Sequence, residues 1–373
     1  MSFRIYRVQA SVVEHRLRAG RAVVSSAGRH DLCRYLLVIV VGDDDVRGYG
    51  EAATTPLWSG ESAETARWVV DRLISPALTG RRLDHPREAL ALMEKAFFGN
   101  PFTKSAVDTA VWDLWARIRD LSVSEIIADR PPVDAIPVRM AISAHPPAET
   151  VTFATEHWNA GFRTLKFKTG LAGIDDVARL RAVRERLGDK PVFTIDANGA
   201  HRSVKEAVEA IEALLPFNLQ LVEQPTPRGR IRMMAEVRKR VPVPILADES
   251  VFTPDDLAEA LDCDAFDLLS IYPGKNGAFT HSLDMIKTAQ LAGKPCIIGS
   301  NLETDLGQAP MACLAASLSA FPVGRLANDL GTGVCYERSS VTPSLVLQHG
   351  SLQVPRGAKG FGVEPVHEYA SHP

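Results

Sequence analysis

The sequence has little of what marks secreted, thiolate-metal, membrane or nucleic-acid-binding proteins. It contains 5 widely scattered cysteines in 373 residues and no Cys-x-x-Cys pair, so we expect neither a disulfide framework nor a zinc site. No apolar run approaches the roughly 18 residues of a membrane span, and no apolar segment follows the N-terminal arginines. Lys+Arg is 42 against Asp+Glu 45, without the basic excess of a nucleic-acid binder. We therefore expect buried thiols in a cytoplasmic protein with no membrane or nucleic-acid partner.

Apolar sequence is plentiful, since 46% of residues are hydrophobic and 23% are charged, which supports a large core. At about 150 residues per domain, the length predicts two to three domains. Residues 1–130 are predicted to form an α+β domain, because two runs rich in β-formers, Arg4–Val13 and Arg34–Val41, precede helical patterns. The clearest helices follow the capping residue Ser62 and cover Thr103–Ile118.

The sequence pattern changes after Pro132, where short apolar runs alternate with helix-length segments. Eight such units predict a closed parallel (β/α) barrel over residues 131–340. The alternative, an open doubly wound sheet, usually has a Gly-rich loop after its first strand, and none follows Ile142. We expect residues 341–373 to pack back on the first domain. The predicted strands are Ile136–Ile142, Thr164–Phe167, Val192–Ile195, Leu219–Val222, Val243–Leu246, Leu268–Ile271, Pro295–Ile298 and Arg325–Ala327.

Acidic side chains close three consecutive strands of this predicted barrel. Asp196, Glu223 and Asp248 are separated by 27 and 25 residues, about one unit each, so they are predicted to converge at the C-terminal face, where barrel enzymes hold their active sites. Like charges brought together require a cation, and oxygen ligands favour Mg²⁺, or Mn²⁺, over zinc. In the alternative, each acid caps the helix that follows it.

Two lysines precede these acids on the neighbouring strand. Lys166 and Lys168 are two residues apart, so both side chains point to one face of the strand. Mutual repulsion and a nearby metal ion would lower the pKa of both amines, so that one could act as a base near pH 7. Three carboxylates, one divalent cation and one protonated lysine balance in charge. A metal ion with open positions could then bind a substrate carboxylate and stabilise the enediolate formed when the α-proton leaves.

These residues resemble the enolase superfamily and, within it, the muconate lactonizing enzyme (muconate cycloisomerase) group. The resemblance implies an α/β fold in which an N-terminal α+β capping domain covers a modified (β/α)8, TIM-like barrel. It further implies Mg²⁺ on Asp196, Glu223 and Asp248, with Lys168 as the acid/base and Lys166 as its partner. It also implies a homo-oligomer. The motifs are Gly48–Ala52, Trp58–Glu61, Gly99–Phe102, Lys166-x-Lys168, Asp196-x-Asn198, Glu223-Gln-Pro225, Asp248-Glu-Ser250, Lys275-Asn-Gly277 and Val354–Glu364.

Departures from that group's pattern bear on the reaction. The group usually has a second catalytic lysine where this sequence has Tyr272, and Lys275 lies three residues later. The seventh strand lacks the histidine of mandelate racemases. Dipeptide epimerases bind the substrate amine with an Asp-x-Asp motif, and only Asp329 of this sequence matches that motif. A one-base cycloisomerase or lyase (dehydratase) therefore fits better than a two-base racemase or epimerase. A barrel that binds a metal and a carboxylate without turnover is a third alternative.

Substrate contacts are expected from polar residues at the mouth and from the capping domain. A basic segment, Leu17–His30, could form a cationic lid or a solvated loop, and His145 is expected to be an ordinary loop histidine. Glu303 could contact substrate or cap the following helix, and Trp58 and Phe102 could line the pocket or belong to the core. The substrate is predicted to be a small-molecule carboxylate, with Asn198, Glu249, Lys275, Asn301, Glu303 and Trp58 as candidate contacts.

Overall fold

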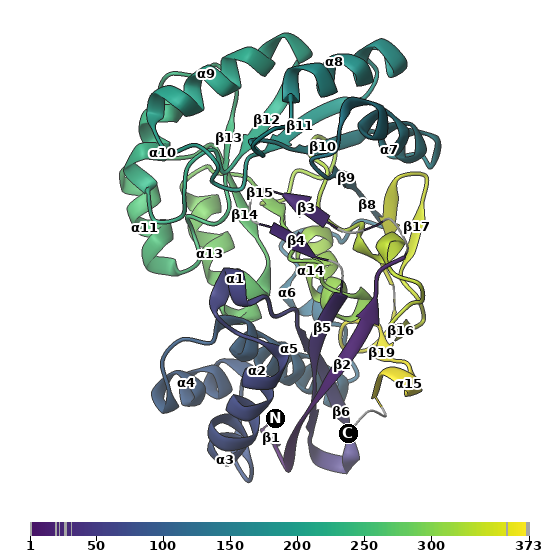
Figure 1. The fold of residues 1–373 in the computed structure, drawn as a ribbon. Coiled ribbons are helices and arrows are strands. Elements are labelled where there is room, and N and C mark those ends of the chain that lie inside the picture. The colour runs from purple at the N-terminus through teal and green to yellow at the C-terminus, as the bar shows by residue number, and fades with distance from the viewer. Residues whose placement is uncertain are drawn as a thin grey trace.

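The computed structural model describes residues 2–18, 21, 23–25, 28–30, 32–355 and 357–370. Its N-terminal part is an antiparallel sheet of three strands, in the order β2-β5-β6, covered by helices (Figure 1). Its elements are β1 (Phe3–Arg4), β2 (Arg7–Arg16), β3 (Val23–Ser25), β4 (Gly28–His30), β5 (Leu32–Val41), β6 (Arg47–Ala52), β7 (Arg82–Leu83), α1 (Pro56–Ser59), α2 (Ala63–Val69), α3 (Ser75–Leu78), α4 (Pro86–Ala96), α5 (Pro101–Ile118) and α6 (Val123–Ile127), with short helices at Asp43–Asp45 and Val70–Ile74.

Helix α5 is buried along nearly its whole length because β6 lies directly on it. A Cβ atom placed on Gly48 or Gly50 would come within about 2 Å of the backbone carbonyl oxygen of Ala110 or Ala106. Only glycine allows so close an approach of strand and helix. The Gly48-Tyr-Gly50 motif is therefore a packing requirement of this part of the fold.

Seven parallel strands follow, in the sequential order β9 to β15, and helices cover their outer side (Figure 1). The strands are β9 (Arg139–Ile142), β10 (Thr164–Lys168), β11 (Val192–Asp196), β12 (Leu219–Glu223), β13 (Ile245–Ala247), β14 (Leu268–Ile271) and β15 (Cys296–Ile298). The helices are α7 (Pro147–Asn159), α8 (Asp176–Leu187), α9 (Val204–Leu214), α10 (Ile231–Arg238), α11 (Pro254–Asp262), α12 (Pro273–Asn276), α13 (Phe279–Leu291) and α14 (Asp305–Ser317), with short helices at Leu215–Phe217 and Thr332–Cys335.

The predicted barrel is confirmed, but the eighth strand is wrong. Residues 325–327 form no strand; the backbone of Asn328 and Asp329 bridges the two outer strands of the sheet instead. The Asn328 amide donates to Pro137 O at 2.9 Å, and the Asp329 amide donates to Ile298 O at 2.9 Å. The Asn328 side chain also accepts the Ile298 amide at 2.8 Å. The hydrogen bond from the Ile298 amide to the Asn328 side chain thus takes the place of a backbone–backbone bond between strands. Residue propensities do not predict such a bond.

The C-terminal segment contacts both parts of the molecule. β18 (Ser351–Gln353) pairs with β8 (Ala135–Pro137), which is a strand separate from β9, although the apolar run Ile136–Ile142 predicts a single strand. Gly360 exchanges backbone hydrogen bonds with the segment before α6, and the Phe361 amide donates to Asp113 of α5 at 2.8 Å. The remaining elements are β16 (Val341–Thr342), β17 (Val346–Gln348), β19 (Glu364–Pro365) and α15 (His367–Ala370).

Two general expectations can be compared with this fold. Cys296 and Cys313 are buried thiols as expected, but Cys263 and Cys335 are partly exposed, and the side chain of Cys33 lies outside the described residues. Within the described ranges, none of the helices combines the length and apolar character that crossing a bilayer requires.

Candidate active site

The three predicted acids lie side by side at the carboxyl ends of adjacent strands. In the register of the sheet, Lys168 on β10 pairs with Asp196 on β11, and Asp196 pairs with Glu223 on β12. Asp248 directly follows β13. All three carboxylates are buried. The spacing of one barrel unit therefore does place them at one height on the barrel mouth.

None of these acids caps a helix. The N-cap positions of α9, α10 and α11 are occupied by Ser203, Arg230 and Thr253, and the side chains of Ser203 and Thr253 accept backbone N–H groups there. The helix-cap alternative is thus wrong for Asp196, Glu223 and Asp248. Their burial at the mouth needs another explanation, because an unpaired buried charge is destabilising.

Ammonium groups lie among the acids. Lys168 Nζ donates to Asp196 Oδ2 at 2.6 Å and to Asn198 Oδ1 at 2.9 Å. Lys166 Nζ lies 3.5 Å from Asp196 Oδ2 and 3.6 Å from Glu223 Oε2. Burial alone would raise the pKa of Asp196, but the two lysines lower it to about 2. Among the described residues, no three His, Cys, Asp or Glu side chains form a ready-made metal-ligand group.

Lys166 belongs to a second buried ion network, which includes Asp329. Its Nζ donates to Asp329 Oδ2 at 2.6 Å. Arg139, on β9, binds both oxygens of Asp329, with Nε 2.9 Å from Oδ1 and Nη2 2.8 Å from Oδ2. Burial by itself lowers the pKa of Lys166, but Asp329 and Glu223 together raise it above its ordinary value. The lowered pKa expected for one of the two lysines beside a bound metal ion stays a prediction.

Tyr272 and Lys275 both lie on the opposite side of the mouth. Tyr272 is buried directly after β14, and its hydroxyl has no hydrogen-bond partner. Burial and the charges of Asp248 and Glu249 raise its pKa well above 10, so the phenol keeps its proton. Lys275, in the short helix α12, does fold inward: its Nζ donates to Asp248 Oδ1 at 3.0 Å, to Asp248 O at 3.0 Å and to Ser270 O at 2.6 Å.

Asn198 and Glu249 complete the set around the acids. Asn198 Nδ2 donates to Glu249 Oε1 at 2.8 Å, while Glu249 Oε2 is buried without a partner. Sequence reasoning assigned no role to Gln224, whose Oε1 accepts the amides of Asp248 and Ser250 at 3.0 and 3.1 Å. Gln224 therefore holds the loop that carries Asp248. Its place in the Glu-Gln-Pro motif was the available signal.

The remaining candidates lie where the barrel meets the N-terminal part. Asn301 Nδ2 donates to Ala53 O at 2.7 Å and to Thr55 Oγ1 at 3.1 Å. Glu303 accepts the Ser300 hydroxyl and the Asn301 amide, and Thr304, rather than Glu303, caps α14. Trp58, in α1, packs against the core and is absent from the cavity lining described next.

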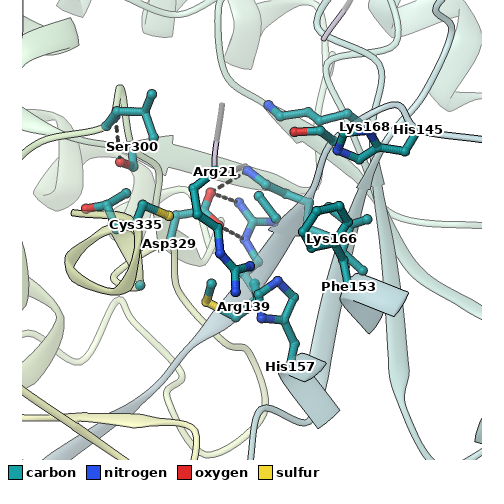
Figure 2. A pocket seen from close by; sticks show the side chains of 17 residues that line it. Arg21, Arg139, His145, Phe153, His157, Lys166, Lys168, Ser300, Asp329 and Cys335 are labelled. Atoms are coloured by element: carbon teal, nitrogen blue, oxygen red, sulfur yellow. Dashed lines mark hydrogen bonds and ion pairs between the residues drawn. The ribbon is translucent and has the colours of Figure 1, made fainter. Parts of the chain in front are cut away.

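A cavity of about 120 Å³ opens beside the two lysines. Figure 2 shows Arg139 and Lys166 directed at Asp329, with Lys168 and His145 nearby. Phe102 is fully buried and absent from this lining. Of the basic segment 17–30, Arg21 lines the cavity and pairs with Glu156 at 3.0 Å, whereas Gly20 lies outside the described residues.

Arg139 was missed, although a signal was present. It is the one charged residue in the otherwise apolar run Ile136–Ile142, and it is almost completely buried. A buried arginine needs acidic partners. The anomaly therefore predicts that this strand meets a carboxylate, but it does not identify Asp329 or Glu223 as that partner.

The donor set fits a hard divalent cation. Oε2 of Glu249 is buried and accepts no hydrogen bond, Oε2 of Glu223 is held by ion pairs with Arg139 and Lys166, and burial raises the pKa of Glu223 to about 7. The acids Asp196, Glu223, Asp248, Glu249 and Asp329 outnumber the cations Arg139, Lys166, Lys168 and Lys275 in the same network. Carboxylate oxygens are the ligands that Mg²⁺ prefers.

Comparison with known proteins identifies the family. Residues 149–370 match the family described as enolase C-terminal domain-like, and residues 7–128 match the mandelate racemase / muconate lactonizing enzyme N-terminal domain. The chain belongs to the enolase superfamily. It is 31% identical to muconate cycloisomerase 1 of Rhodococcus opacus over 336 residues, which is 88% of both chains. It is 32% identical to the L-Ala-D/L-Glu epimerase of Bacillus subtilis over 285 residues, covering 76% of this chain and 77% of the relative.

A solved structure agrees with this assignment. The dipeptide epimerase of Cytophaga hutchinsonii, complexed with Mg and the dipeptide D-Ala-L-Val, superposes with a TM-score of 0.91 at 27% identity, over 98% of this chain and 97% of that one. The relatives of this chain are enzymes, named as cycloisomerases, epimerases or racemases. The chain is thus an enzyme of the enolase superfamily, related both to muconate cycloisomerases and to dipeptide epimerases.

Proposed function

We propose that this enzyme moves the proton α to a substrate carboxylate in a one-base reaction, most simply a cycloisomerisation, with Lys168 as the acid/base. Asp196, Glu223 and Asp248 would hold Mg²⁺, with Mn²⁺ as a possible substitute. The observation that carries the proposal is the register of Lys168, Asp196 and Glu223 on adjacent strands, next to a cavity that Lys168 itself lines. When bound, Mg²⁺ supplies positive charge for the substrate carboxylate as the proton leaves.

Lys168 and Lys166 would then have different tasks. Lys168 Nζ donates to Asp196 and Asn198. As a neutral amine it keeps two N–H donors for these acceptors, and its lone pair would take the substrate α-proton to give the ammonium. Lys166 is held by Asp329 at 2.6 Å, so we assign it the role of a fixed positive charge beside the reacting carboxylate. Such a preorganised charge stabilises negative charge that develops during the reaction.

The opposite side of the mouth favours one base over two. An ammonium has three N–H donors, and Lys275 directs them at three acceptors, so it serves as an ion partner of Asp248. Tyr272 offers a buried hydroxyl without a partner. A neutral phenol can orient the substrate or donate a proton, but it is a poor base.

The second candidate is a racemase or epimerase, because relatives of both kinds match the chain. The two reactions differ in how many faces of the substrate exchange. We would screen muconates, acid sugars and N-acyl amino acids with Mg²⁺, and then incubate each enantiomer of a substrate in D₂O. One-base chemistry predicts deuterium in one enantiomer only. Incorporation into both at similar rates would establish the epimerase alternative.

A non-catalytic barrel would bind a carboxylate and exchange nothing. The same D₂O experiment separates this alternative, since it predicts no deuterium at the α-carbon of any bound carboxylate. The division into residues 1–130, 131–340 and 341–373, the cytoplasmic location and the homo-oligomer remain predictions.

A further inference from the structure

Among the described residues that line the cavity beside Lys166 and Lys168, Asp329 is the one acidic side chain. Both of its oxygens are already bound: Oδ1 by Arg139 Nε, and Oδ2 by Arg139 Nη2 and Lys166 Nζ, at 2.6–2.9 Å. Figure 2 shows these three contacts from the side of the cavity. A substrate ammonium that approached Asp329 would therefore meet a carboxylate whose charge two cations already neutralise.

Four other lining residues, Arg21, Arg139, Lys166 and Lys168, are cationic, and most of the remainder are apolar or neutral. The partners of Arg21 and Lys168, Glu156 and Asp196, do not themselves line the cavity. His157 also lines the cavity, and burial lowers its pKa to about 4, so it remains neutral. The cavity as a whole thus favours an anion over a cation.

Arg139 is the residue that neutralises the charge of Asp329. It comes from β9, it is almost completely buried, and its Nη2 also lies 2.8 Å from Glu223 Oε2. Its Nη1 is buried without a hydrogen-bond partner. Buried donors that lack an acceptor are uncommon in native proteins, and this one belongs to a cavity-lining side chain.

We propose that Arg139 determines specificity: by neutralising Asp329, it makes the cavity accept substrates with a second carboxylate remote from the reacting one and reject those whose remote end is an ammonium. This inference rests on the proposed function, because it treats the cavity as the site of the remote end. Arg139 acts through Asp329 and through the charge of the cavity, and it takes no part in proton transfer.

The test compares two ligands that differ only at the remote end. N-succinyl-L-alanine and β-alanyl-L-alanine share an N-acyl-L-alanine carboxylate, and one ends in a carboxylate where the other ends in an ammonium. Isothermal titration calorimetry of the Mg²⁺-loaded protein should show at least tenfold tighter binding of N-succinyl-L-alanine. Equal affinities, tighter binding of β-alanyl-L-alanine, or no saturable binding of N-succinyl-L-alanine would overturn the proposal.

A variant then assigns the preference to Arg139. Arg139→Met should reduce the ratio of the two affinities at least tenfold, whereas Arg325→Met, which removes an exposed arginine, should leave it unchanged. Retention of the full preference in a folded Arg139→Met protein would contradict the assignment. Arg139→Lys, which keeps the charge, should retain part of the preference. The comparison of the two ligands on the parent protein stands even where these variants do not fold.

Failure of this inference can be told from failure of the proposed function. Exchange of the substrate α-proton in D₂O reports the proton transfer, and the ratio of affinities reports Arg139. Exchange without a preference for the second carboxylate would refute the specificity alone. A preference without exchange in any carboxylate would refute the proposed reaction.

Discussion

Two groups of buried acids in this protein are held in different ways. In α5, Asp108 accepts the Thr280 amide at 2.8 Å and the Thr280 hydroxyl at 3.0 Å. Asp113 accepts the amides of Tyr49 and Phe361 and the Nε of Arg117, at 2.8–3.0 Å. At the barrel mouth, by contrast, Asp196 accepts the Lys168 ammonium besides one backbone amide, and Oε2 of Glu223 is held by ion pairs with Arg139 and Lys166.

The difference separates structural acids from those of a reactive site. The acids of α5 join chain segments far apart in the sequence, and backbone N–H groups satisfy them. Those of the mouth converge from adjacent strands and depend on cationic side chains. A buried polar atom without a partner, such as Oε2 of Glu249, calls for an explanation, and the proposed divalent cation would provide it. Substitutions in the two groups should therefore affect different properties.

The largest effect is expected at Asp248. Asp248→Asn removes a predicted metal ligand and the charge beside Lys275, so turnover should be abolished and Mg²⁺ binding weakened. Calorimetric titration with Mg²⁺ gives the affinity, and thermal unfolding followed by circular dichroism should show a folded barrel. Unchanged Mg²⁺ affinity would remove Asp248 from the metal site.

Lys168→Ala should be next in size. A general base commonly contributes about 10²–10⁴-fold to the rate, and the loss here should exceed this range because no other described residue is positioned to accept the α-proton on that face. Steady-state kinetics measures the loss. Activity within tenfold of the parent, which corresponds to about 1.4 kcal/mol, would exclude Lys168 as the base.

Asp113 should behave in the opposite way. Asp113→Ala leaves two buried amides and Arg117 without their acceptor, so we expect a loss of about 3 kcal/mol in the free energy of unfolding, measured by urea denaturation. The kcat of the variant should equal that of the parent, since the partners of Asp113, which are Tyr49, Arg117 and Phe361, lie outside the mouth. A large fall in kcat with unchanged stability would erase the distinction between the two groups.

The smallest effect concerns pH. Burial raises the pKa of Asp108 to about 7, above the value of about 3.9 expected in the unfolded chain. The folded state then binds the proton more tightly, so the contribution of Asp108 to stability is present at low pH and falls as pH rises from about 4 to 7. Asp108→Asn should gain about 2 kcal/mol relative to the parent between pH 5 and 7. A difference in stability between Asp108→Asn and the parent that stayed the same at every pH would contradict the raised pKa of Asp108.

Much of the fold could be predicted, because periodicity is a local property. Seven strands and helices such as α5 lie within a few residues of their predicted positions, since β-branched runs and caps such as Ser62 are readable one segment at a time. The closure of the barrel was not readable. It depends on the Asn328 side chain replacing a ladder hydrogen bond at Ile298, a contact between residues 30 positions apart.

The residues of the candidate site also differ in whether the sequence alone could place them. Residues at strand ends, such as Asp196 and Glu223, could be placed together because the barrel itself sets their height. The contacts of Asn301 with the segment after β6 and the inward turn of Lys275 depend on loops, whose paths sequence spacing does not fix. Arg139 illustrates a third case, in which the sequence shows an anomaly and only the structure supplies its partners.

Exchange of the α-proton tests the central claim most directly. The parent enzyme and Lys168→Ala would be incubated with Mg²⁺ and each carboxylate of the screening panel in D₂O, and loss of the α-proton signal would be followed by NMR. The account predicts exchange of at least one carboxylate with the parent and none with Lys168→Ala. Exchange at the parent rate in the folded Lys168→Ala protein would contradict it.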